Sequence, residues 1–345
     1  MKTTPGAMIG LGSITGQILG GFLIQANIFG LGWRPIFLIN LPIGALTIWA
    51  ASTALKESRA EHAARLDPFG MLIVSVGLFL FSFPFLEGRE AGWPPWAWLS
   101  LLGSLPVLWG FWRFEQRQAR LGRTPLLQPR LLQDRGFVVG LLVTCIYFAG
   151  HTSMLLVLSL YLQLSLNLNP MNAGLALVPF SFGFLVGSSV SGKLNGYLGR
   201  NSLHLGTAVL ALSLIALIGE AGSGWREARL LFAVTCFVYG VGRGFVTAPL
   251  FNTVLSGVPA RDAGAASGVA STMQQIANSV GIAVIGAVVF SCISTNPHPA
   301  GYAYGFVVAG IINLGMLVIA SALLFFIPKS RGRDIPRGEP VLVEG

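Results

Sequence analysis

Charged residues are scarce in this chain of 345 residues. Only 10% of its residues are Asp, Glu, Lys or Arg, whereas a soluble globular domain carries about 25%. The hydrophobic share is 53% and the mean hydropathy is +0.71. Because no long polar stretch is present, the composition excludes a protein built mainly of soluble domains. It predicts a polytopic membrane protein of the all-α class.

Cysteine and histidine are also few. The three cysteines fall inside apolar segments and lack the spacing of a metal site or a disulfide framework, so we interpret them as small buried hydrophobic residues. Only four histidines are present, and the sequence contains no H-E-x-x-H, P-loop or G-x-S-x-G motif. We therefore expect no enzyme activity, no metal ion and no cofactor.

Acidic residues are missing from the middle of every apolar segment. All 13 lie in loops or near the ends of apolar segments, and Glu87 and Glu220 come closest to the apolar interior. Proton-coupled transport usually uses a buried carboxylate that binds a proton in one state and releases it in another. The sequence therefore offers no obvious acidic residue for proton coupling.

Basic residues give the chain a net charge of +9, and their distribution is uneven. When the loops are assigned to alternate sides, 17 of the 22 Lys and Arg residues fall on one side and four on the other. This asymmetry is the positive-inside pattern of membrane proteins, and it explains the charge without a nucleic-acid-binding surface. It predicts that both termini are cytoplasmic, and we expect no nucleic-acid partner.

Ten segments are apolar and long enough to span a bilayer, for which about 20 residues are needed. They fall near residues 7–27, 35–54, 69–86, 96–114, 137–160, 173–192, 202–219, 230–250, 269–292 and 302–327. Short connections separate nearly all of them, so neighbours are expected to run antiparallel. The longest polar connection, from Glu115 to Arg135, divides the chain into a four-helix front and a six-helix back.

Two motifs near the start carry the most information. In the first, Gly12, Gly16 and Gly20 recur once per helical turn, followed by Gly21, a pattern that permits close helix packing. The next segment opens with the run Trp33-Arg34-Pro35-Ile36-Phe37-Leu38-Ile39-Asn40-Leu41-Pro42-Ile43-Gly44. Together these residues resemble the antiporter motif of the major facilitator superfamily, and the match looks closest to its fourteen-helix drug:proton antiporter branch (EmrB/QacA type).

The resemblance implies a major-facilitator fold in which the motif belongs to the fifth helix, so the chain is expected to lack the first four helices. Residues 1–55 are then the last two helices of the first lobe, and 56–135 are two inserted helices with a basic cytoplasmic loop. Residues 136–328 are a complete six-helix second lobe, and 329–345 are a cytoplasmic tail. The implied activity is multidrug or small-molecule efflux across the plasma membrane by alternating access, with protons, the lipid bilayer and a small-molecule substrate as partners.

Position 17 departs from the family pattern. The family has proline there, which kinks a helix, whereas this chain has Gln17. Gln17 cannot produce that kink, although its amide can form a hydrogen bond across a helix interface. The alternative interpretation, a general helix-packing seam without a role in antiport, stays open.

Two segments of the back half also resemble the family. Gly240, Gly242 and Gly244 occupy every second position before Pro249, which predicts a weak, bendable helix suited to gating. Further along, Gln274 stands where the family usually has arginine, and we count it among the residues that line the cavity.

Arg243 is the only unambiguous charge at membrane depth, and such residues are functional candidates by default. Its partner is expected on another helix, in a cavity, or on a substrate with an anionic or polar group; alternatively, it binds backbone carbonyls or extends toward the interface. His151 is the other titratable residue in an apolar run, and it is either a proton relay or a hydrogen-bonding core residue. Gln163 and Asn313 are further cavity candidates.

Three interpretations of the whole chain follow. The first is a fragment of an efflux transporter. The second is a non-transporting membrane scaffold that keeps the fold. The third is a carrier that completes its first lobe by dimerising or by pairing with a separate four-helix chain.

Overall fold

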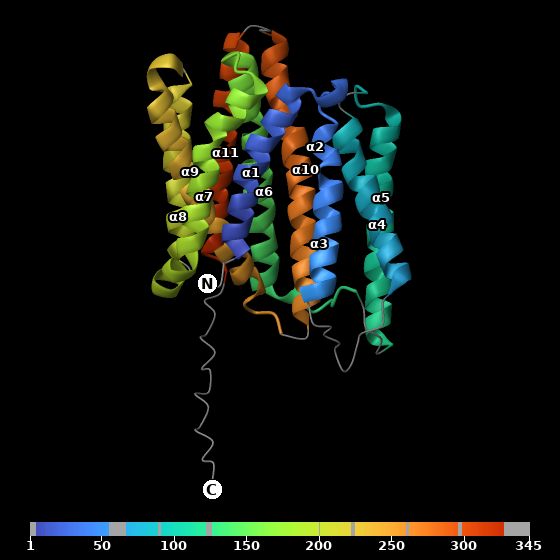
Figure 1. Ribbon diagram of the computed structural model, residues 1–345. Helices are drawn as coiled ribbons and strands as arrows, with labels where there is room; N and C mark the ends of the chain where they lie inside the picture. Colours follow the sequence, from blue (N-terminus) through green and yellow to red (C-terminus); the bar gives the residue numbers. More distant parts are fainter. Residues whose placement is uncertain are drawn as a thin grey trace.

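The computed structural model describes residues 5–54, 67–88, 91–121, 126–199, 201–221, 225–259, 262–295 and 299–327. Within these ranges every regular element is a helix. The helices stand side by side and form one bundle (Figure 1). The all-α fold class predicted from the composition is thereby confirmed. The predicted tail, 329–345, lies outside the described residues.

The elements follow one another along the chain with short connections. In order they are α1 (Pro5–Ala26), η1 (Ile28–Gly30), α2 (Pro35–Leu38), α3 (Asn40–Ala54), α4 (Pro68–Glu87), α5 (Pro95–Arg120), η2 (Leu131–Gln133), α6 (Arg135–Leu160), η3 (Tyr161–Ser165), α7 (Pro170–Leu198), α8 (Asn201–Glu220), α9 (Trp225–Leu255), α10 (Ala263–Thr295) and α11 (Pro299–Leu324).

Eight helical segments in the described part of the chain are long and apolar enough to cross a membrane. One combines α2 with α3, one combines α6 with η3, and the others belong to α4, α7, α8, α9, α10 and α11. The remaining predicted segments correspond to α1, whose apolar portion Ile14–Ala26 is shorter, and to α5. Both stand alongside the other helices in the bundle (Figure 1).

Local sequence explains where several helices begin. The side chains of Asp67, Asp134 and Asn169 each accept a hydrogen bond from the backbone N–H three residues later, at 2.9, 2.7 and 2.8 Å. These N-caps satisfy donors that a helix start leaves unpaired. In α4 and α7 the cap is followed by proline, which fits the first helical turn because it has no N–H to satisfy there.

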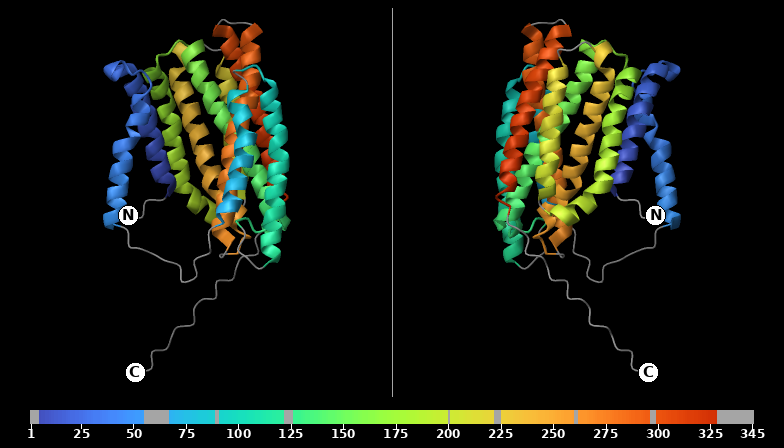
Figure 2. Two further views of the ribbon diagram at one scale, coloured as in Figure 1. Left: turned by 90° about the vertical axis from the view of Figure 1, so that its right-hand side faces the viewer. Right: turned by 90° about the vertical axis from the view of Figure 1, so that its left-hand side faces the viewer.

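One hydrophobic core joins α6 to α11. All its buried members come from residues 131–327, and Phe137, Phe180 and Phe306 are almost completely buried within it. α1 packs on α7, whereas α4 and α5 pair with each other and α4 touches α10. Figure 2 shows α1 to α3 at one edge of the bundle and the α4–α5 hairpin at the other. No residue of α3 is buried.

Glycines bring α7 and α9 to backbone contact. A Cβ atom on Gly240 would collide with the carbonyl oxygen of Phe180, and one on Gly244 would collide with the backbone of Ser188. Facing them on α7, Gly183 and Gly187 meet the backbone of α9 in the same way. Because residues four apart share a helix face, these glycines form two matching stripes, which we call the α7–α9 seam.

Gly242 explains why glycine recurs at every second position. It lies about 200° around the helix from Gly240, and a Cβ there would come within 2.9 Å of the backbone nitrogen of Leu210 on α8. α9 therefore has glycine on two faces because two helices approach it closely. It is one continuous helix with Pro249 inside it. Packing accounts for these residues, and their predicted role in gating stays a prediction.

A carboxylate pair lies where α4 begins and α5 ends. Glu115, just beyond the predicted span 96–114, is completely buried, and its Oε2 atom accepts a hydrogen bond from the backbone N–H of Leu127 at 2.8 Å. Its Oε1 atom and the Oδ2 atom of Asp67 are buried without a hydrogen-bond partner, and both lie close to Gly70. Burial raises the pKa of the Glu115 carboxyl; the charge of Asp67 acts in the same direction, and the bond from Leu127 opposes it.

Glu115→Gln is expected to remove a pH dependence from the stability of this hairpin. Because folding raises the pKa of Glu115, its protonated carboxyl contributes fully to the free energy of unfolding below the ordinary pKa of 4.5. This contribution is lost as the pH rises through the folded-state pKa. A glutamine can still accept the bond from Leu127, and its NH₂ group can donate to Asp67. Thermal unfolding of both proteins between pH 4.5 and 8 measures the difference. Glu87→Gln, an exposed carboxyl at the other end of α4, is the control, and a wild-type stability that rises with pH contradicts the prediction.

Candidate functional site

The first motif lies in α1, which contacts the α6–α11 unit through α7. The Oγ atom of Ser181 donates a hydrogen bond of 3.0 Å to the side-chain oxygen of Gln17. One turn further on, a Cβ atom on Gly21 would lie 3.1 Å from backbone atoms of Met171 and Pro170. Gln17 thus bonds across a helix interface, and α1 is a continuous helix at the position where the family has proline.

The glycine stripe of α1, at positions 12, 16 and 20, does not face α7. A Cβ atom on Gly12, Gly16 or Gly20 would meet nothing within 4 Å. In a helix, position 21 lies about 100° around the axis from position 20, so Gly21 belongs to the face that meets α7 and the stripe does not. Gly12, Gly16 and Gly20 thus contact no helix among the described residues, and the expectation that they pack against a helix stays a prediction.

The second motif is also on an open face. Trp33 is 58% exposed, and the guanidinium of Arg34 lies over its ring at 5.3 Å. The side-chain amide of Asn40, at the start of α3, donates to the carbonyl of Ile36 in α2 at 3.5 Å. Pro42 is exposed, and a Cβ on Gly44 would meet nothing within 4 Å. These residues shape the turn between α1 and α3 and make no contact with Arg243 or His151.

Arg243 lies between α9 and α7 among aromatic rings. Its guanidinium carbon is 4.6 Å from the ring centre of Phe184 and 5.5 Å from that of Phe180. The hydroxyl groups of Tyr147 and Tyr239 lie near enough to interact with it electrostatically. Its Nε atom is buried without a hydrogen-bond partner, although the residue as a whole is only partly buried.

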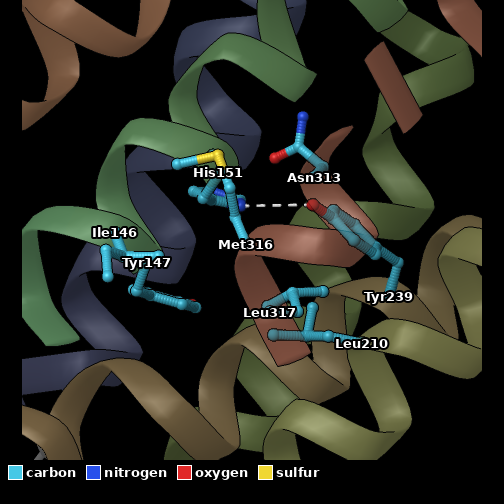
Figure 3. A pocket seen from close by; sticks show the side chains of 9 residues that line it. Ile146, Tyr147, His151, Leu210, Tyr239, Asn313, Met316 and Leu317 are labelled. Carbon is cyan, nitrogen blue, oxygen red and sulfur yellow. Dashed lines mark hydrogen bonds between the residues drawn. The ribbon is translucent and has the colours of Figure 1, made fainter. Parts of the chain in front are cut away.

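His151 lies near enough to Arg243 to interact with its charge. It also borders a small cavity (Figure 3). Its Nδ1 atom lies 3.5 Å from the hydroxyl of Tyr239, and its Nε2 atom is buried without a partner. The cavity, about 10 Å³ in volume, is also lined by Tyr147 and Asn313. A polar cavity of this size suits one water molecule, and it is too small for an organic substrate.

The structure thus brings His151 close to Arg243 on one side and to Asn313 on the other, and it leaves two other candidates apart. Gln163 lies in η3, where its amide donates to the hydroxyl of Ser159 at 3.0 Å. Gln274 lies in α10, which contributes no residue to the cavity. Within the described ranges, no group of three His, Cys, Asp or Glu side chains is arranged to hold a metal ion.

Four aromatic residues of this site escaped the sequence analysis. They are Tyr147, Phe180, Phe184 and Tyr239. The signal was a spacing of four: Tyr147 precedes His151, Phe180 precedes Phe184, and Tyr239 precedes Arg243 by four positions each. Each pair lies on one face of its helix, and the three faces meet around the guanidinium. We call Arg243, His151 and these four aromatic residues the Arg243 site.

Comparison with known proteins gives consistent matches over most of the chain. Residues 6–282 match the family model of the Major Facilitator Superfamily. The probable actinorhodin transporter of Streptomyces coelicolor is 39% identical over 294 residues, which are 84% of this chain and 50% of that protein. The cephamycin export protein CmcT of Amycolatopsis lactamdurans is 31% identical over 340 residues, 95% of this chain and 66% of that protein.

A third relative has a similar extent. The multidrug resistance protein Stp of Mycobacterium tuberculosis is 29% identical over 299 residues, 85% of this chain and 53% of that protein. The chain therefore spans about half to two thirds of the length of these relatives. With the family model matched over most of its length and a multi-pass helical bundle, the chain belongs to the major facilitator superfamily.

Proposed function

We propose that this chain is part of an exporter that moves small molecules out of the cell by alternating access. The observation that carries the proposal is the contact between α1 and α7: Gln17 and Gly21, both in the antiporter motif, lie directly on α7. In alternating access, two lobes rock around a central site near the middle of the membrane. A motif helix that reaches across to α7 is the contact that such rocking must make and break.

The finer parts of the proposal follow the resemblance. The chain is assigned to the fourteen-helix drug:proton antiporter branch and to the plasma membrane, with both termini cytoplasmic and protons as the coupling ion. Residues 1–55 complete a first lobe whose other four helices precede them in the family, residues 56–135 form the inserted hairpin, and 136–328 form the second lobe. The shared core of α6 to α11 supports this division.

Export by intact cells tests the proposal. Cells without their own exporters, expressing the complete gene product that contains these 345 residues, are loaded with ethidium or with carboxyfluorescein, and the release of each dye is followed. We expect faster release of at least one dye than from empty-vector cells, and we expect a protonophore to abolish the difference. Chain that is present in the membrane but leaves both rates unchanged contradicts the proposal.

A non-transporting scaffold is the alternative, and one observation favours it. α3 has no buried residue, and among the described residues no atom lies within 4 Å of a Cβ placed on Gly12, Gly16 or Gly20. The described helices therefore do not by themselves close a central site on that side. A first lobe completed by a second copy, or by a separate four-helix chain, would reconcile this open face with transport. Crosslinking in membranes that yields only the monomer excludes both kinds of completion.

A further inference from the structure

The outward face of α5 carries one tryptophan and three arginines in a line. All four are exposed and follow one another at spacings of four, four and three residues, which puts them on one face of the helix. They are Trp109, Arg113, Arg117 and Arg120, and we call them the α5 arginine face. The opposite side of the helix meets α4 and holds its buried residues, which are Ala97, Ser104, Phe111 and Glu115.

The arginines begin at the depth of a membrane interface. Trp109 is exposed, and exposed tryptophans of membrane helices favour the level of the lipid headgroups. Arg113 follows about 6 Å further along the helix and Arg120 about 16 Å, whereas the headgroup layer is about 5–7 Å thick. Helical side chains lean toward the N-terminus of their helix, so Arg117 and Arg120 are directed back toward the headgroups.

The membrane side of Trp109 is apolar on the same part of α5. Trp98, Leu102 and Leu105 are exposed there and precede Trp109 at helical spacing. Figure 2 shows the α4–α5 hairpin at one edge of the bundle, where acyl chains can reach it. A molecule with an acyl chain and an acidic headgroup can therefore contact the apolar and the basic parts of one helix face.

Trp109 and Arg113 form a contact of their own. The guanidinium carbon of Arg113 lies 5.3 Å from the ring centre of Trp109, within the range of a cation–π interaction. The ring supplies no oxygen acceptor for the five N–H donors of the guanidinium. Arg117 lies one turn further on, close enough for both guanidinium groups to reach one phosphate, whose oxygens match the guanidinium fork.

Neither helix stability nor the overall charge pattern accounts for this arrangement. Cations in the last turn stabilise a helix C-terminus, which explains Arg117 and Arg120, but Arg113 lies two turns before the end of α5. The positive-inside pattern places basic residues on one side of the membrane, but it does not require them to share a helix face. Glu115, the one acidic residue of α5, is buried toward α4 and accepts its hydrogen bond from Leu127.

We infer that the α5 arginine face binds the headgroup of an anionic phospholipid. Arg113 and Arg117 hold the phosphate through their N–H groups, Trp109 contacts the glycerol region and the upper acyl chain, and Arg120 adds positive charge. A zwitterionic lipid is disfavoured because its cationic group meets no acidic residue on this face. The inference concerns how α5 meets the membrane and does not depend on export.

Lipid binding to the purified protein tests the inference. The complete gene product that contains these residues is titrated in a nonionic detergent with phosphatidylglycerol or with phosphatidylcholine of the same acyl chains, and bound lipid is measured by native mass spectrometry. We expect phosphatidylglycerol to bind more tightly. One arginine near anionic lipid contributes about fivefold, so Arg113→Gln with Arg117→Gln is expected to weaken phosphatidylglycerol binding about 5- to 25-fold and to leave phosphatidylcholine unchanged.

Two further double variants keep the result interpretable. Arg130→Gln with Arg135→Gln removes two exposed arginines from the connection into α6 and is expected to change the affinity less than about twofold. Arg113→Lys with Arg117→Lys keeps both charges without the planar fork and is expected to retain part of the preference for phosphatidylglycerol. Wild-type protein without that preference overturns the inference. Equal effects of the two glutamine variants, or a lysine variant as weak as the glutamine variant at the same positions, also overturn it.

Glycerol 3-phosphate distinguishes a lipid site from a site for a soluble anion. It carries a phosphate group but has no acyl chain, so it cannot contact the apolar part of α5. We expect phosphatidylglycerol to stay bound when glycerol 3-phosphate is added at the same concentration. Displacement under these conditions would show that the arginines bind a soluble phosphate compound, and it would overturn the assignment to a lipid.

Discussion

Gly240→Ala is expected to destabilise the folded chain by about 3 kcal/mol, the upper end of the range for overpacking. The added methyl group would collide with the carbonyl oxygen of Phe180 and would lie 2.8 Å from the backbone nitrogen of Phe184. A flexible side chain could move aside, but here the obstacle is the backbone of α7. Thermal unfolding of the purified protein in detergent, with the yield of monodisperse protein, measures the effect.

Gly315→Ala is the matched control. Gly315 lies inside α11, and a Cβ atom there would meet nothing within 4 Å. Alanine is the better helix former by about 1 kcal/mol, so this variant is expected to be as stable as wild type or more stable. Similar stability of Gly240→Ala and Gly315→Ala would show that α7 and α9 are not in backbone contact.

Gly21→Leu is expected to separate α1 from α7. The isobutyl group would have to occupy the space of Met171 and Pro170, whose backbone atoms already lie 3.1 Å from a Cβ. Overpacking costs about 1–3 kcal/mol, which shifts the ratio of docked to undocked α1 by roughly 5- to 150-fold. A short thiol-to-thiol crosslinker between Gln17→Cys and Ser181→Cys reports the docked state, because a hydrogen bond of 3.0 Å joins the native side chains.

The neighbouring glycine provides the control for this separation. Gly20→Leu adds the same side chain one position away, where nothing lies within 4 Å, and its crosslinking yield is expected to equal that of the parent protein. The three native cysteines are replaced in all these proteins, so that only the engineered pair reacts. Equal yields for Gly20→Leu and Gly21→Leu would contradict the placement of α1 on α7.

The glycines show how far the sequence leads and where it stops. A spacing of four predicts close packing because it places small residues on one helix face, but it does not name the partner. Gly12, Gly16 and Gly20 have the more regular spacing, yet the residues that contact α7 are Gln17 and Gly21. Which face is used depends on where α7 lies, and that position results from the packing of the core.

The Arg243 site shows a similar limit. The rarity of charge in apolar segments identified Arg243 and His151 directly from the sequence, because burial of an unpaired charge is costly. Their common neighbourhood was not predictable, since 92 positions separate them and each was judged on its own helix. The sequence shows that Arg243 and His151 each follow a tyrosine by four positions. That spacing identifies a common site only once the three helices are known to lie together.

The α7–α9 seam also limits how a compound dissolved in the bilayer can enter the protein. At Gly183, Gly187, Gly240 and Gly244 the two backbones leave no room even for a methyl group. A lipophilic molecule therefore cannot slip sideways from the acyl chains between these two helices, because an aromatic ring is far wider than the space a missing Cβ leaves. Any lateral portal must open between another pair of helices.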